Sequence, residues 1–306
     1  MSETKKTVVL IPCYNEEKTI AKVIQDFKRE LPQADIVVYD NNSKDQSNQI
    51  AKENGAIVYQ ENRQGKGYVV NAMFKDIDAD IYIMVDGDDT YPAENIHKLL
   101  EKFKEEKLDM VIGDRLSNGS YAKENKRNFH GFGNKLVRFL INKLFRVKLQ
   151  DIMSGYRIFS KNFVKNYPAL SSGFQLETDM TIFALDKKFK IAEVPVSFRE
   201  RPAGSVSKLN TYSDGFKVIM TIFNLYRYYR PMMFFGMISI LFVILSLIAG
   251  TPVILEFVEM HYIYKVPSAI LASGFGILAI LFFVTGLILD AITRINRENF
   301  EIKIKN

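Results

Sequence analysis

Three clusters of polar residues follow short apolar runs between residues 12 and 92 of this 306-residue chain. The last of them, Asp86-Gly87-Asp88-Asp89, comes directly after the apolar run at 81–85. Carboxylates at positions i and i+2 after a strand can reach one divalent cation, and Mg²⁺ or Mn²⁺ prefers oxygen ligands that it often shares with phosphate groups. The pattern therefore indicates a site for a metal ion and a diphosphate, although a solvated acidic turn would have the same residue types.

The other two clusters have residue types that suit a nucleotide. Tyr14 offers a ring that can stack on a base, and Glu16 can accept hydrogen bonds from ribose hydroxyls. Alternatively, Asn15 is the N-cap of a helix that has acidic residues in its first turn. Asp40 can accept a hydrogen bond from a base N–H or a ribose hydroxyl, or it can form an Asx turn. The glycine-containing loop around Lys66 opens a predicted helix, and a cation with backbone N–H groups at a helix N-terminus suits a phosphate.

Short β-rich runs alternate with amphipathic, helix-length stretches from residue 1 to about residue 200. The patterns predict strands at 7–11, 35–39, 56–59, 81–85 and 110–112, and helices at 16–31, 47–54, 67–77 and 95–106. This alternation predicts an α/β fold, with a mostly parallel sheet and helices on both faces. Because ligands bind outside the carboxyl ends of the strands in such sheets, we expect the three clusters to meet in one crevice.

Two uncharged segments, 232–255 and 266–289, each exceed the roughly 20 apolar residues with which a helix crosses a membrane. They predict a transmembrane hairpin, with a pair of buried core helices as the alternative. Lys and Arg residues flank the pair on its outer sides, so the positive-inside rule places both termini in the cytoplasm. The segments 134–148 and 216–230 mix basic with apolar and aromatic residues, which predicts either membrane-interface helices or core-facing helices with a basic outer side.

The composition excludes several classes of protein. The chain has 41 Lys and Arg against 35 Asp and Glu, one cysteine and three histidines. One cysteine excludes an internal disulfide framework, and three scattered histidines argue against a zinc site. The N-terminal residues contain no apolar segment of signal-peptide length, so we expect the front domain to stay in the cytoplasm. Basic residues interleaved with apolar ones, without a basic stripe, predict no nucleic-acid partner.

Four of these stretches, VVLIPCYNEEKTI, VVYDNNSKDQS, NRQGKG and IYIMVDGDDTYP, together resemble glycosyltransferase family 2, whose catalytic domain has the GT-A fold. The later stretches MSGYRIFSK, FQLETDM and EVPVSFRERPAGSVSKL resemble its polyprenyl-phosphate subgroup, which includes the dolichol-phosphate mannose synthases and bacterial undecaprenyl-phosphate glycosyltransferases. The resemblance covers most of residues 5–230 and the two-span tail. It implies a cytoplasmic GT-A catalytic domain at 1–211, an interfacial amphipathic helix at 212–231, two transmembrane helices within 232–292 (about 232–256 and 266–290) and a cytoplasmic tail at 293–306.

The resemblance also implies roles for individual residues. It places the donor nucleotide at Pro12, Tyr14, Glu16 and Asp40, and the metal ion and diphosphate at Asp86 and Asp88. Thr90 is a weaker candidate metal ligand, because it stands where the mannose synthases tend to have Gln. The acceptor phosphate would be surrounded by Arg115, Arg127, Ser154 and Arg201, with Ser207 and Lys208 in a loop that closes over both substrates. Arg157 would lie beside them or have a structural role, and Asp86, Asp88 and Arg201 would be the catalytic residues.

The implied activity is transfer of a sugar from a nucleotide-sugar donor to a polyprenyl phosphate at the cytoplasmic membrane face, giving a lipid-linked monosaccharide for cell-envelope glycan modification. A lipid phosphate is largely dianionic at neutral pH and can attack the sugar without a general base, which predicts inversion at the sugar carbon. The protein then has to stabilise charge, with Mg²⁺ or Mn²⁺ as cofactor. We expect UDP-hexose or UDP-N-acetylhexosamine as donor, with GDP-mannose as the alternative. Glu177 and Asp179 could orient the sugar or the basic residues.

Two other functions compete with this one. A processive polysaccharide synthase of the same fold would resemble the donor half, but the chain has no tryptophan for the Gln-x-x-Arg-Trp motif of those enzymes and only two candidate spans. A non-catalytic membrane sensor of sugar nucleotides would not need the intact acidic motif or the basic residues that follow it. The hairpin buries little surface by itself, so a homo-oligomer through the hairpin is a further expectation.

Overall fold

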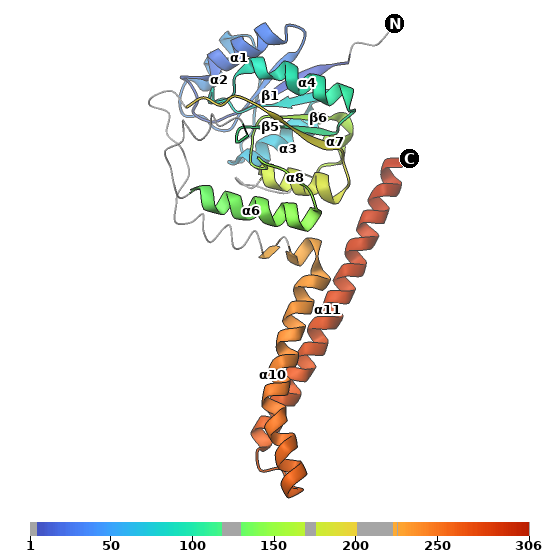
Figure 1. The fold of residues 1–306 in the computed structure, drawn as a ribbon. Coiled ribbons are helices and arrows are strands. Elements are labelled where there is room, and N and C mark those ends of the chain that lie inside the picture. Colours follow the sequence, from blue (N-terminus) through green and yellow to red (C-terminus); the bar gives the residue numbers. More distant parts are fainter. Residues whose placement is uncertain (1–4, 118–129, 169–175, 201–222, 225, 306) are drawn as a thin grey trace. The chain divides into compact units, whose positions relative to one another are not determined.

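The computed structural model describes residues 5–117, 130–168, 176–200, 223–224 and 226–305. The chain divides into two compact units, Met1–Thr211 and Tyr212–Asn306. The first unit contains a seven-stranded sheet and its helices, and the second contains two long helices (Figure 1).

The sheet has the strand order β3-β2-β1-β4-β6-β5-β7. The strands are β1 (Thr7–Cys13), β2 (Asp35–Asp40), β3 (Ile57–Gln60), β4 (Ile81–Met84), β5 (Met110–Asp114), β6 (Arg157–Ser160) and β7 (Ile191–Pro195). Only β6 is antiparallel to its neighbours, β4 and β5, and the other pairs are parallel. The predicted α/β fold with a mostly parallel sheet is therefore confirmed, and β6 and β7 are strands that the sequence patterns missed.

The helices of this unit cover both faces of the sheet, with α1, α2 and α4 on one side and α3 and α8 on the other (Figure 1). Their bounds are α1 Ile20–Glu30, α2 Ser47–Glu53, α3 Lys66–Asp76, α4 Ile96–Glu105, α6 His130–Phe145, α7 Lys161–Asn166 and α8 Leu176–Asp186, and a 3₁₀ turn, η1 (Ala93–Asn95), precedes α4. The helix predicted at 16–31 was wrong at its start. Residues 16–19 form a turn, and helix α1 begins only at Ile20.

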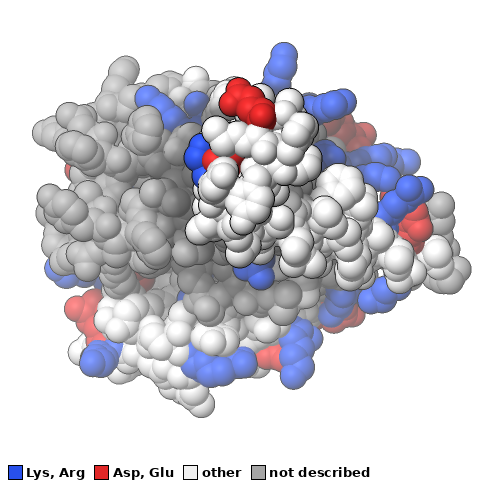
Figure 2. All heavy atoms as spheres, turned by 90° about the horizontal axis from the view of Figure 1, so that it is seen from below, with Lys and Arg blue, Asp and Glu red and all other residues white. Residues whose placement is uncertain are grey.

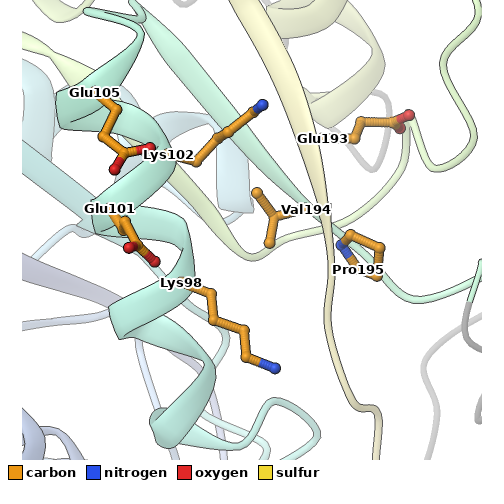
Figure 3. Close-up of a pocket in the computed structure, with 7 residues that line it drawn as sticks. All are labelled: Lys98, Glu101, Lys102, Glu105, Glu193, Val194 and Pro195. Carbon is orange, nitrogen blue, oxygen red and sulfur yellow. The ribbon is translucent and has the colours of Figure 1, made fainter.

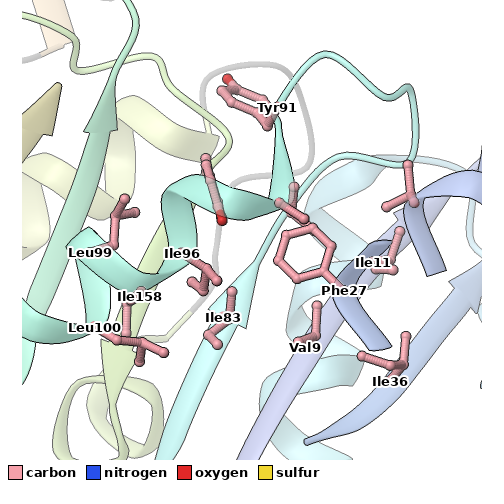
Figure 4. Close-up of a cluster of buried hydrophobic side chains, with 14 of the residues drawn as sticks. Val9, Ile11, Phe27, Ile36, Ile83, Tyr91, Ile96, Leu99, Leu100 and Ile158 are labelled. Carbon is pink, nitrogen blue, oxygen red and sulfur yellow. The ribbon is translucent and has the colours of Figure 1, made fainter. Parts of the chain in front are cut away.

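The hydrophobic core lies between the sheet and helices α1 and α4 (Figure 4). Val9 and Ile11 of β1 and Ile83 of β4 are fully buried and meet Phe27 from α1. Both central strands are apolar at every position in their middle, because helices cover both faces. This core fixes β1 and β4 side by side, and the polar clusters that follow them are positioned by it.

Among its described residues, the second unit contains α10 (Pro231–Met260) and α11 (Val266–Lys305), both long and apolar enough to cross a membrane. Few residues of their apolar segments are buried, unlike those of core helices. In the view from below, the end of the pair that faces the viewer is mostly uncharged (Figure 2). The hydroxyl of Ser239 donates to the carbonyl of Ala279 at 2.8 Å, and that of Ser246 donates to Ala272 at 2.8 Å. Such hydrogen bonds join helices in an apolar environment, so the two helices form one packed hairpin.

Candidate active site

The acidic motif follows the central strand β4. Asp88 is 4% exposed, and its Oδ1 accepts hydrogen bonds from the backbone N (3.2 Å) and the hydroxyl (2.6 Å) of Thr90. Asp86 is half-buried beside it. The Thr90 hydroxyl therefore orients Asp88 in this structure, and its role as a metal ligand stays a prediction.

Lys66 is the first residue of α3, and its side chain reaches the acidic motif. Its Nζ lies 2.5 Å from Asp86 Oδ1 and 2.7 Å from Glu177 Oε1, which belongs to α8. Burial by itself would lower the pKa of Lys66, but the negative charges of Asp86 and Glu177 outweigh it and raise that pKa above its ordinary value. Lys66 is therefore a fixed cation between two carboxylates. The orienting role expected of Glu177 or Asp179 stays a prediction.

Glu177 contributes to the stability of this arrangement as well. Glu177→Gln would leave Lys66 with one anionic partner, and because Glu177 is buried we expect a loss of about 1–3 kcal/mol in the free energy of unfolding. Urea unfolding followed by circular dichroism measures it. Glu105→Gln, at an exposed position of α4, is the matched control and should change the stability by less than about 0.5 kcal/mol. Equal effects of the two substitutions would contradict a structural contribution from the Lys66–Glu177 pair.

A glycine lies against the other side of Asp86. A Cβ atom added to Gly155, in the loop before β6, would collide with Asp86 Oδ2 and come within 3.0 Å of its Cγ. The loop backbone can approach the carboxylate this closely only because residue 155 has no side chain. Asp86 is thus enclosed by Lys66 on one side and by the Gly155 backbone on the other.

The first two clusters lie side by side because β1 and β2 are parallel neighbours, with Cys13 opposite Asp40. The hydroxyls of Ser43 and Ser47 accept hydrogen bonds from the backbone N–H groups of Asn15 (2.9 Å) and Glu16 (2.8 Å). Asn15 caps no helix, so this alternative was wrong. It adopts a left-handed backbone (φ 54°), and its side chain accepts a hydrogen bond from the Lys44 N–H. The turn at Tyr14 and Glu16 is therefore held by the second cluster.

Asp40 is the buried acidic residue of this region. It is 3% exposed at the end of β2, and its Oδ1 has no hydrogen-bond partner among the residues that the structure describes. A buried acceptor without a donor is costly unless a bound molecule supplies one. Its neighbour Asn41 donates to the carbonyls of Glu61 and Arg63, both at 2.8 Å, and thereby ties the loop before α3 to the same place.

Of the residues expected around an acceptor phosphate, three are described. Arg115 forms a bidentate ion pair with Asp151, with Nε at 2.6 Å and Nη2 at 2.9 Å, and its guanidinium lies over the rings of Tyr91 and Phe198. Ser154 is fully buried, and its hydroxyl is 3.3 Å from the Tyr91 hydroxyl.

Arg157 differs from Arg115, because no part of it is exposed. Its guanidinium donates to the carbonyls of Ser154 and Ile152, both at 2.8 Å, and to the Thr181 hydroxyl at 3.0 Å. These contacts favour the structural alternative for Arg157, as the group that holds the loop before β6 against α8. The other expected acceptor residues, Arg127, Arg201, Ser207 and Lys208, lie outside the described residues.

Asp86 and Asp88 are the carboxylates that could hold a divalent ion. Within the described ranges, no group of three or more His, Cys, Asp or Glu side chains could hold a metal. Two carboxylates suit an ion such as Mg²⁺ or Mn²⁺ that takes its remaining ligands from water and phosphate oxygens. The donor set therefore fits a metal that binds together with a diphosphate.

A cavity of about 290 Å³ lies elsewhere, between α4 and β7 (Figure 3). Its lining combines Lys98, Glu101, Lys102 and Glu105 of α4 with Glu193, Val194 and Pro195 of β7. The Glu193 carboxylate already accepts the backbone N–H groups of Gln150 and Asp151, both at 2.7 Å. The cavity is lined by none of the expected site residues.

A family model and several known proteins that resemble this chain are all glycosyltransferases. The model of "Glycosyl transferase family 2" matches residues 8–167, more than half of the chain. The glycosyltransferase AglJ of Haloferax volcanii is 29% identical over 96% of this chain and 95% of its own length. The dolichyl-phosphate hexose transferase of the same organism is 30% identical over 68% of this chain and 88% of its own.

Among solved structures, glucosyl-3-phosphoglycerate synthase from Mycobacterium tuberculosis, in complex with Mn²⁺, UDP and glucosyl-3-phosphoglycerate, matches with a TM-score of 0.58 and 20% identity. The match covers 72% of this chain and 79% of that one. At this level of identity the likeness concerns the fold, and it agrees with the GT-A architecture expected from the sequence.

Proposed function

Because the chain belongs to glycosyltransferase family 2, we propose that it transfers a sugar from a nucleotide sugar to a polyprenyl phosphate at a membrane surface. The observation that carries this proposal is the placement of Asp40, Asp86 and Asp88 at the carboxyl ends of β2 and β4, with Lys66 of α3 paired to Asp86. Two helices of membrane-spanning length belong to the same chain. The site suits a nucleotide diphosphate, and the helices suit an acceptor that resides in the membrane.

A polyprenyl phosphate as acceptor is supported by the relatives. The Haloferax volcanii relative is named a dolichyl-phosphate hexose transferase, and a Mycolicibacterium smegmatis relative that is 26% identical over 68% of this chain is named a polyprenol monophosphomannose synthase. In our proposal, Arg115 and Ser154 bind the acceptor phosphate together with Arg127, Arg201, Ser207 and Lys208. The domain borders expected from the sequence, and the cytoplasmic position of both termini, are part of the same proposal.

The donor would bind across the first two clusters. Pro12, Tyr14, Glu16 and Asp40 would hold the nucleoside, and Lys66 would hold its phosphates. Asp86 and Asp88 would hold Mg²⁺ or Mn²⁺, as suggested by the complex of the M. tuberculosis enzyme with Mn²⁺ and UDP. The unpaired Asp40 Oδ1 suits a uracil N–H, so a UDP-hexose or a UDP-N-acetylhexosamine is favoured over GDP-mannose.

The mechanism follows from charge. The acceptor phosphate is a dianion at neutral pH, so it can attack the sugar carbon directly while the diphosphate leaves from the opposite side with inversion. When bound, the divalent ion would supply positive charge to the leaving diphosphate. Lys66 is held near that group by Glu177 and would supply a second positive charge without reorganisation. No residue has to act as a general base.

A transfer assay tests the proposal. Membranes that contain the protein would be given radiolabelled UDP- and GDP-sugars with undecaprenyl or dolichyl phosphate, with either Mg²⁺, Mn²⁺ or EDTA. We expect a labelled lipid that is extracted into organic solvent and is lost with EDTA. Long labelled polymer without labelled lipid would indicate a processive synthase instead. Tight nucleotide binding without any transfer would indicate a sensor.

Asp40 gives a test of the nucleotide site alone. Asp40→Asn would place an amide where a carboxylate accepts from the base, so we expect UDP to bind about tenfold more weakly, as for the loss of one hydrogen bond to a charged group. Isothermal titration calorimetry measures the affinity. Asp35→Asn, at the exposed opposite end of the same strand, is the control and should bind UDP normally. Unchanged affinity in Asp40→Asn would remove Asp40 from the base site.

A further inference from the structure

Helix α11 continues far beyond its membrane-spanning length. It has 40 residues, whereas about 20 suffice to cross the hydrocarbon core, and its first charged residue is Asp290. Beyond Asp290 the helix is rich in charged residues, as expected for a segment in water. Three isoleucines in this charged segment nevertheless expose about half of their surface: Ile292 (48%), Ile295 (53%) and Ile302 (60%). A row of large apolar side chains along one side of a charged helix marks a candidate interaction surface.

The spacing of these residues indicates what kind of partner fits. Ile288, Ile292, Ile295, Asn299 and Ile302 follow one another at steps of 4, 3, 4 and 3 residues. This is the a/d spacing of a coiled coil, with Ile292 and Asn299 at a and the other three at d. Within the span, the same spacing continues through Leu278, Leu281 and Thr285. We refer to the positions from Ile288 to Ile302 as the α11 seam.

The seam lies on a side of α11 that does not face α10. The α11 residues in contact with α10 include Ala272 and Ala279, whose carbonyls accept from α10 serines, and Gly286, next to Phe235. The rings of Phe275 and Phe282 also lie against the α10 phenylalanines Phe235 and Phe242. Arg297 also turns this way, and its Nη2 donates to the carbonyl of Tyr229 at 3.3 Å. In the same heptad these α11 residues occupy positions b, e and f, and none of them is at a or d. Helix α11 can therefore pack on α10 and present its a and d positions to another helix at once.

We propose that the α11 seam pairs with the same seam of a second copy of this chain, in a parallel coiled coil. Two copies inserted in one membrane have the same orientation, so their α11 helices can only run parallel. In that arrangement Glu298, at position g, faces Lys303 of the partner, at position e, and the two charges are complementary. Within one chain Glu298 pairs with Arg294 at 3.0 Å, an exposed contact that can be shared or exchanged at little cost.

Asn299 defines the register of this coiled coil. A polar residue at a single a position is satisfied best by the same residue of the partner, which disfavours shifted pairings. Isoleucine at both a and d positions, by contrast, favours three or four strands over two. The proposal therefore fixes the surface, the orientation and the register, and the number of copies is the quantity that the experiment measures.

Cysteine cross-linking tests the seam directly. Ile295→Cys places a thiol at a d position, and Arg294→Cys, one residue earlier, places it about 100° around the helix at an exposed position. In membranes containing the full-length protein and treated with a mild oxidant, we expect at least about tenfold more disulfide-linked dimer from Ile295→Cys. The unchanged chain is the background, because Cys13 is buried and desolvation raises the pKa of its thiol to about 12. Equal yields, or none at either position, would overturn the proposal.

A second variant tests whether the seam holds the copies together. Ile295→Glu/Ile302→Glu introduces charge into the seam, and Ile304→Glu, at position f, is the matched control. The mass of each protein would be measured in lipid nanodiscs by mass photometry, with circular dichroism as the check on folding. We expect a multimer for the unchanged chain and the control, and a single copy for the double variant. A single copy for the unchanged chain, or a multimer for the double variant, would refute the seam.

Discussion

Asp88→Asn is expected to lower sugar transfer about a thousandfold while the catalytic unit stays folded. The carboxylate would hold the divalent ion against the leaving diphosphate, and an ion in that position stabilises the transition state by several kcal/mol, which corresponds to about three orders of magnitude in rate. Asparagine keeps an oxygen that can still accept the hydrogen bonds of Thr90, so the local structure should be retained. Initial rates of lipid labelling at saturating donor measure the effect.

The adjacent residue provides a matched control. Asp89 has the same side chain, but it pairs with Lys22 at 2.7 Å and adopts a left-handed backbone (φ 57°) that asparagine readily accepts. Asp89→Asn should therefore reduce transfer less than tenfold. Electron paramagnetic resonance of Mn²⁺ in the presence of UDP should show weakened binding in Asp88→Asn and normal binding in Asp89→Asn. If both variants transferred sugar at similar rates, Asp88 would have no special role in the reaction.

Much of this fold follows from local patterns in the sequence. The apolar runs at β1, β2 and β4 are long enough to predict buried strands, and their order along the chain brings the polar clusters to one edge of the sheet. Strands β6 and β7 were missed although β3 and β5 are equally short, because their place in the sheet depends on pairing with strands that are distant in the sequence. The start of α1 was misplaced because the hydroxyls of Ser43 and of Ser47, the first residue of α2, hold the backbone of residues 15 and 16 in a turn.

The candidate site, like the fold, could be predicted from the sequence only where its residues lie in one short motif. Asp86 and Asp88 are visible in the sequence because both lie in one short motif. The contact of Lys66 with Glu177 joins residues 111 positions apart, and no local pattern reports it. Arg157 lies in a stretch that resembles the polyprenyl-phosphate subgroup, yet only its burial and its bonds to backbone carbonyls distinguish a structural arginine from one that binds phosphate.

Gly155→Ala is expected to reduce transfer about a hundredfold through Asp86 alone. The new methyl group would collide with the Asp86 carboxylate, which is a short side chain with little freedom to move away. Asp86 would have to rotate, and it would then leave both Lys66 and the position from which it can reach a shared ion. A displacement of about 1 Å in such a group costs on the order of a hundredfold in rate.

Gly87→Ala separates this effect from the general cost of adding a methyl group. Gly87 lies between the two aspartates, but a Cβ atom there would meet its neighbours at 3.5 Å or more, an ordinary contact distance. It should therefore keep most of the transfer activity, although it is closer to the motif in sequence. Both proteins would be compared by lipid labelling, by Mn²⁺ binding with UDP and by thermal unfolding. Near-normal Mn²⁺ binding and transfer in Gly155→Ala would mean that Asp86 does not need its present position, and the metal site would then have to be assigned to other residues.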